Sequence, residues 1–134
     1  MAIAWNKSFE IGHLEIDEQH KQLIERYNEF MAACASGKGK LEVEYAINYL
    51  IDYAVRHFAA EEDLQIKIDY PGFDRHKQMH DAFKLTATKL AGQLKDEGSS
   101  ARLIVKFNAE IGDWIDRHIK TEDKKIAEYI SRNN

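Results

Sequence analysis

The chain of 134 residues has little of what several protein classes require. Its single cysteine excludes an internal disulfide, and with it a secreted disulfide scaffold. One proline and seven glycines are too few for the frequent turns of an all-β domain. Charged residues interrupt every apolar stretch well short of the ~20 residues that a membrane span needs, and we see no signal peptide. The net charge of -4 argues against a nucleic-acid surface or a polybasic membrane surface.

The remaining composition is typical of one soluble globular domain. Hydrophobic residues make up 44% of the chain and charged residues 31%, and the length suffices for one core but not for two. We therefore expect a single domain over residues 1–134 in the cytoplasm, with neither membrane insertion nor a nucleic-acid partner. The richly charged outer faces of the expected helices favour a monomer.

Apolar residues recur at spacings of three and four in four segments, which predicts four helices at about 17–36, 41–68, 74–95 and 101–131. Asp17 is a plausible N-cap of the first helix, and Pro71 marks a turn between the second and the third. Residues 1–16 are expected to form an N-terminal arm, with Trp5 and Phe9 covering one side of the domain. The predicted fold is all-α, an antiparallel up-down-up-down four-helix bundle with this arm.

Five of the six histidines fall on the apolar stripes of these helices: His20, His57, His76, His80 and His118. A single histidine on such a stripe is usually a core residue with a hydrogen-bond partner. Five buried imidazoles without partners would cost a few kcal/mol each, which a small domain does not tolerate. His13 lies in the arm, and we expect it to be a surface or structural residue.

The spacing of these histidines favours metal binding. His76 and His80 are four residues apart, so their rings lie on one helix face and can bind one ion. His57 and Glu61 have the same spacing, which places a carboxylate beside an imidazole on an inward face.

His118 and Asp123 are five residues apart, so a regular helix would turn their side chains about 140° from one another. Both reach one site only if the helix contains a π-bulge, or if the ions lie between two helix faces.

In an antiparallel bundle the starts of the first and third helices lie beside the ends of the second and fourth. Seven side chains then converge at one end of the core and predict a buried metal site: His20, His57, Glu61, His76, His80, His118 and Asp123. This set is too large for one ion and sufficient for two, and its nitrogen and oxygen donors suit iron, manganese or zinc. If both carboxylates and one further oxygen bridge two six-coordinate ions, about one position stays open for a small diatomic ligand.

Several motifs of this site closely resemble hemerythrin, particularly the bacterial single-domain hemerythrins: DEQH ending at His20, HFAAEE at 57–62, HKQMH at 76–80 and WIDRHIKTED at 114–123. The resemblance implies two non-haem iron ions with an oxo or hydroxo bridge. It assigns His76, His80 and His118 to one iron and His20 and His57 to the other, with Glu61 and Asp123 as bridges. It also implies an O2 pocket lined by Leu23, Trp114 and Ile115.

The function that this resemblance implies is reversible O2 binding for carriage, storage or delivery, without enzymatic activity. An oxygen-consuming enzyme or a reductase is the expected partner. The alternatives are oxygen or redox sensing, and reduction of peroxide or nitric oxide at the same centre. Iron storage or a two-metal hydrolase is a less favoured alternative. Gln65 departs from the family pattern, which often has methionine there, and would add a polar group near the site. Cys34 is expected to be a buried packing residue.

Overall fold

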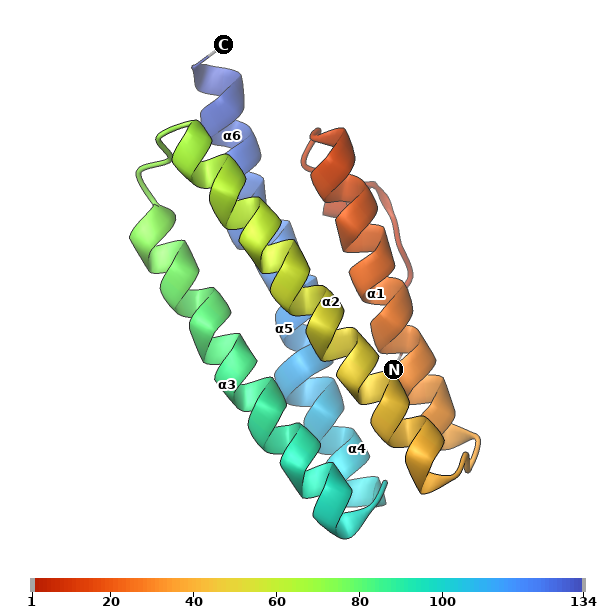
Figure 1. Cartoon of the computed structure of the whole chain (residues 1–134). Helices are drawn as coiled ribbons and strands as arrows, with labels where there is room; N and C mark the ends of the chain where they lie inside the picture. Colours follow the sequence, from red (N-terminus) through yellow and green to blue (C-terminus); the bar gives the residue numbers. More distant parts are fainter. Residues whose placement is uncertain (1, 134) are drawn as a thin grey trace.

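The computed structural model describes residues 2–133, which form a four-helix bundle without strands in this range (Figure 1). The predicted all-α class is therefore confirmed. Met1, the first residue of the predicted arm, and Asn134 lie outside the described residues. The elements are the 3-10 turn η1 (Lys7–Phe9), the helices α1 (Leu14–Ala35), α2 (Lys40–Lys67) and α3 (Phe73–Glu97), and a fourth helix of five consecutive segments. Those segments are α4 (Ala101–Phe107), η2 (Asn108–Gly112), α5 (Asp113–His118), η3 (Ile119–Asp123) and α6 (Lys124–Arg132).

The apolar stripes of the four helices meet in one core that runs along the bundle. Its largest fully buried side chains include the aromatic rings of Tyr27, Phe30, Phe58 and Phe107. Cys34 is buried in the same core and is a free thiol, in agreement with a packing role. Within residues 2–133, no helix combines the length and the apolar character that crossing a membrane requires.

The first helix begins at Leu14, because its N-cap is His13 and not Asp17 as the sequence suggested. A ring nitrogen of His13 accepts a hydrogen bond from a backbone N–H of the first turn, as N-cap side chains do. The carboxylate of Asp17 instead accepts from the backbone N–H groups of Ile11 and Gly12, at 2.7 and 3.1 Å. Asp17 thus holds the turn that leads from the arm into the helix.

The described part of the arm folds back along the bundle. The side chain of Asn28 in α1 pairs with both backbone groups of Ile3, each at 2.8 Å. Phe9 is buried, stacks on Trp5 at 5.3 Å between ring centroids, and lies under the amine of Lys120 in η3. The arm therefore covers the bundle between α1 and the fourth helix.

Two π-helical turns, η2 and η3, interrupt the regular hydrogen bonding of the fourth helix. At η2, the backbone passes close to Tyr27, so that a Cβ atom on Gly112 would lie 2.6 Å from the Tyr27 Cζ. The Tyr27 hydroxyl donates a hydrogen bond to Asn108 Oδ1 at 3.1 Å. At η3, the wider turn lies between His118 and Asp123, where the spacing of five required either an irregularity or ions between two faces.

Candidate metal centre

The structure brings all seven predicted ligands together near one end of the bundle. They come from the start of α1, the later half of α2, the start of α3, and the α5–η3 junction, and all are buried: His20, His57, Glu61, His76, His80, His118 and Asp123. In Figure 1 this end carries the start of α1 and the α2–α3 turn. His118, at 6% exposure, is the most accessible of the seven.

The ligand atoms form two groups that share both carboxylates. His76, His80 and His118 belong to one group and His20 and His57 to the other, while Glu61 and Asp123 belong to both. Within each group, one donor atom per residue lies within 4.8 Å of every other. Two overlapping groups of this kind are suited to two adjacent ions.

Glu61 divides its two oxygens between these groups. Its Oε1 lies 2.7 Å from His76 Nε2 and 3.2 Å from His80 Nε2. Its Oε2 lies 3.3 Å from His57 Nε2 and 3.4 Å from His20 Nε2. A carboxylate in this position can bridge two ions with one oxygen on each.

Asp123 has the same arrangement because of the π turn. Its Oδ1 lies 3.1 Å from His76 Nε2 and 3.2 Å from His118 Nε2, and its Oδ2 lies 2.9 Å from His20 Nε2. On a regular helix Asp123 would point about 140° away from His118. The wider turn of η3 brings both side chains to one site, so the π-bulge alternative is the one that the structure shows.

The donor atoms fit metal ions better than they fit one another. His118 Nε2 lies 3.1 Å from His76 Nε2 and 3.2 Å from His80 Nε2. These separations match the ~3 Å between adjacent nitrogen ligands of an octahedral ion with bonds of about 2.1 Å. Several buried donor atoms also lack a hydrogen-bond partner: His20 Nε2, Glu61 Oε2 and both Asp123 oxygens. Imidazole and carboxylate donors without thiolate suit iron, manganese or zinc.

The electrostatics of the cluster show which groups hold protons when no ion is bound. Burial alone would raise the pKa of Glu61, but the four histidine rings around its oxygens hold it well below its ordinary value. The pKa of Asp123 is lowered as well, because neighbouring histidines outweigh burial and the charge of Glu61. Burial lowers the pKa of His57, whereas for His20 and His76 the two carboxylates overcome burial and raise the pKa to about 9. Metal ions that bind at neutral pH would therefore displace protons from His20 and His76.

Two residues outside the predicted set orient the histidine rings. His57 Nδ1 lies 2.8 Å from Gln19 Oε1, and His80 Nδ1 lies 2.8 Å from Glu62 Oε2. When Nδ1–H donates to these oxygens, the Nε2 atom of each ring is left free to bind an ion. Sequence reasoning missed both residues, although Gln19 precedes a ligand and Glu62 follows one directly in the chain.

The residues predicted to line an O2 pocket lie in two settings. Leu23 and Ile115 are buried in the apolar core. Trp114 is half-buried and stacks on the ring of His118, with centroids 4.2 Å apart and an interplanar angle of 10°. Phe58 contacts Trp114 edge-on and stacks on His80 at 3.9 Å. The histidines of one group therefore have an aromatic wall.

Trp114 and His118 also line a surface cleft of about 450 Å³, with Met79 on α3 and Arg117 on α5 among its other walls. This cleft gives solvent a route to the edge of one ligand ring.

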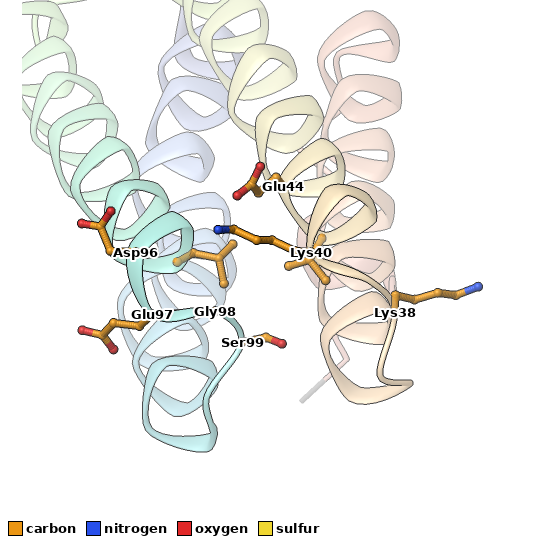
Figure 2. A pocket seen from close by; sticks show the side chains of 9 residues that line it. Lys38, Lys40, Glu44, Asp96, Glu97, Gly98 and Ser99 are labelled. Carbon is orange, nitrogen blue, oxygen red and sulfur yellow. The ribbon is translucent and has the colours of Figure 1, made fainter.

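Figure 2 shows a second pocket, of about 320 Å³, at the opposite end of the bundle. Lys40 and Glu44 of α2 and Asp96 of α3 stand around it, and no histidine lines it. It is therefore separate from the metal-binding cluster. His13, the N-cap of α1, also lies outside the cluster.

Comparisons with known proteins agree with this geometry. Residues 13–130 match the sequence model of the hemerythrin HHE cation binding domain. A hemerythrin-like protein of Naegleria gruberi is 34% identical over 121 residues, which cover 90% of this chain and 87% of the relative. A bacteriohemerythrin of Stenotrophomonas maltophilia is 28% identical over 96% of this chain and 81% of its own length. A hemerythrin from Sipunculus nudus is 26% identical over 94% of this chain and 92% of its own length.

Proposed function

The chain belongs to the hemerythrin family, and on that premise we propose that it holds two non-haem iron ions and binds O2 reversibly. The observation that carries this proposal is the pair of buried ligand groups that share Glu61 and Asp123. The role that we propose is carriage, storage or delivery of O2, by a monomer in the cytoplasm that is not an enzyme.

In this proposal His76, His80 and His118 hold one ion, His20 and His57 hold the other, and the two carboxylates bridge them. Two ferrous ions would supply the two electrons that O2 withdraws on binding and returns on release. The protein supplies an asymmetric ligand set, three imidazoles on one side and two on the other, which leaves room for a small ligand on the side of His20 and His57.

Two properties of the chain favour reversible binding. Five of the seven ligands are neutral imidazoles, which donate less negative charge than a carboxylate-rich set and so stabilise highly oxidised iron less. Leu23, Ile115 and Phe58 are buried in the apolar core, where they limit the access of water and protons. Both properties oppose irreversible oxidation.

A stopped-flow experiment tests this proposal. The protein is loaded with two equivalents of ferrous iron without oxygen, mixed with O2, and then returned to oxygen-free buffer. Reversible binding predicts an absorbance change that appears with O2 and disappears when O2 is removed, over repeated cycles. A single irreversible change, or binding of far fewer than two irons, would refute it.

Two histidine variants provide the matched control. His118→Ala removes a proposed ligand and should abolish both the second equivalent of iron and the reversible signal. His13→Asn alters a histidine outside the cluster while keeping a good N-cap, so iron binding and the O2 response should stay unchanged.

A second candidate is the reduction of peroxide or nitric oxide at the same ions. The cleft over Trp114 and His118 favours it, because an electron donor bound there would touch a ligand ring. Catalytic consumption of peroxide or nitric oxide in the presence of a reductant would support this reaction over O2 carriage.

A further inference from the structure

Gln65 is a fully buried polar residue to which the proposed centre gives no role. It lies on α2 one turn after Glu61 and two turns after His57, on the same inward face. Its exposure is 0%, and neither Oε1 nor Nε2 has a hydrogen-bond partner. A buried carboxamide without partners destabilises a fold, because both groups lose their hydrogen bonds to water. Unless its environment supplies a hydrogen-bond partner, the buried carboxamide therefore only lowers the stability of the fold.

His20, whose ring lies 3.4 Å from the Glu61 carboxylate one turn before Gln65, has the complementary deficiency. His20 Nδ1 is buried and has no hydrogen-bond partner. His20 Nε2 faces Asp123 Oδ2 at 2.9 Å and Glu61 Oε2 at 3.4 Å, so Nε2 is the atom that would bind an ion. When Nε2 binds an ion, Nδ1 carries the proton and needs an acceptor.

The other rings show what that acceptor does. His57 and His80 each have a side-chain oxygen 2.8 Å from Nδ1, from Gln19 and Glu62. Two metal ions would account for His20 Nε2 and for the unpartnered oxygens of Glu61 and Asp123. They would leave His20 Nδ1 and the Gln65 carboxamide without partners.

We propose that Gln65 is the outer hydrogen-bond partner of His20, through one buried water that accepts from Nδ1–H and donates to Gln65 Oε1. We place a water between them because neither group forms a hydrogen bond with a protein group of the described residues, and two buried polar groups suffice to hold one. Gln65 is then a positioning residue: it acts on the metal centre by fixing the tautomer and orientation of His20. The inference rests on the proposed function, since His20 must bind an ion through Nε2.

Zinc-loaded protein provides a test that does not depend on oxygen chemistry. Zinc accepts the same nitrogen and oxygen donors and is diamagnetic, so ¹⁵N-labelled histidine side chains can be followed by NMR. The His20 Nδ1–H signal, assigned by its loss in His20→Gln, should be present and exchange slowly with solvent. In Gln65→Met, which fills similar space without a polar group, its exchange should be at least about tenfold faster and zinc affinity about tenfold weaker.

Three further variants separate positioning from packing. Gln65→Glu keeps an acceptor oxygen and should restore the slow exchange of the His20 signal. Gln65→Leu repeats the loss with a second apolar side chain, in case Gln65→Met does not fold. Gln93→Met removes another glutamine with an unpartnered buried oxygen, toward the far end of α3, and should leave His20 unchanged.

An unchanged His20 signal in Gln65→Met or Gln65→Leu, with two equivalents of zinc bound, would overturn this inference and leave the proposed centre intact. Failure of the wild-type protein to bind two equivalents would overturn both. The zinc stoichiometry therefore distinguishes the two failures.

Discussion

Removing the metal ions should reverse the sign of the pH dependence of stability above pH 6.5. In the metal-free protein burial lowers the pKa of His20 and His76, but Asp123 and Glu61 outweigh burial and raise it to about 9. The ordinary value of 6.5 applies to the unfolded chain. Both histidines therefore stabilise the fold fully below pH 6.5, and this stabilisation is lost as the pH rises toward 9.

The size of the effect follows from the same values. A rise of the His20 pKa from 6.5 to about 9 corresponds to about 3 kcal/mol of unfolding free energy. His76 shares both carboxylates with His20, so the two contributions do not add in full. The pKa of His57 is lowered below 6.5, so this residue is neutral in both states over most of the range. We expect the metal-free protein to lose about 3 kcal/mol between pH 6.5 and pH 9.

Urea unfolding with a chelator present, repeated at several pH values in this range, measures that loss. Metal-loaded protein is the matched comparison, because rising pH removes the protons that compete with the ions and so tightens metal binding. Metal-free His20→Gln should lose less stability than the wild type over the same range. A metal-free stability that stays level or increases from pH 6.5 to pH 9 would refute the reasoning.

Three other perturbations test separate parts of the structure. Glu62→Gln replaces a charged hydrogen-bond acceptor and should weaken metal binding about 10–100-fold in a chelator competition, whereas Gln19→Glu should not weaken it. Equal metal affinities of Glu62→Gln and the wild type would show that these outer hydrogen bonds are unimportant. Leu23→Ala should lower the unfolding free energy by about 2–5 kcal/mol and speed autoxidation of the iron-loaded protein, and an unchanged autoxidation rate would contradict a gating role. Gly112→Ala should lower the unfolding free energy by about 1–3 kcal/mol in urea unfolding, because the new Cβ meets the ring of Tyr27. The loss should be smaller in a Tyr27→Phe background, and an equal loss of unfolding free energy in both backgrounds would exclude the hydroxyl as part of the clash.

The ligand set could be predicted from the sequence because it depends on helix periodicity and on which helix ends lie together. A spacing of four places His76 beside His80 on any regular helix, and bundle topology places His20 near His57. The spacing of five between His118 and Asp123 required either an irregular helix or ions between two helix faces, and could not choose between them. That choice depends on packing in the fourth helix, which the structure shows as the π turn η3.

Other features depend on packing that the pattern of apolar residues does not specify. Asp17 and His13 are both acceptable caps, and the turn of the arm decides which one caps α1. On α2, the apolar Leu64 is half-buried, whereas the polar Gln65 that follows it is fully buried. On hydrophobicity alone, Leu64 would be the buried residue of the two. Burial of the polar residue follows from the position of Glu61 one turn earlier, on the same helix face.

The wide turn at η3 makes the end of the chain depend on a match between winding and length. Straightening this turn into a regular helix, with no change in length, would rotate everything after it by about 100°. Asp123 would leave the ligand cluster, and Ile126, now fully enclosed, would swing toward water in the same movement. Deleting one residue from 119–122 as well would place the aspartate four positions after His118, the spacing at which a regular helix puts two side chains on one face. Ligand supply and the anchoring of the last helical segment are thus set together, by one turn and the number of residues in it.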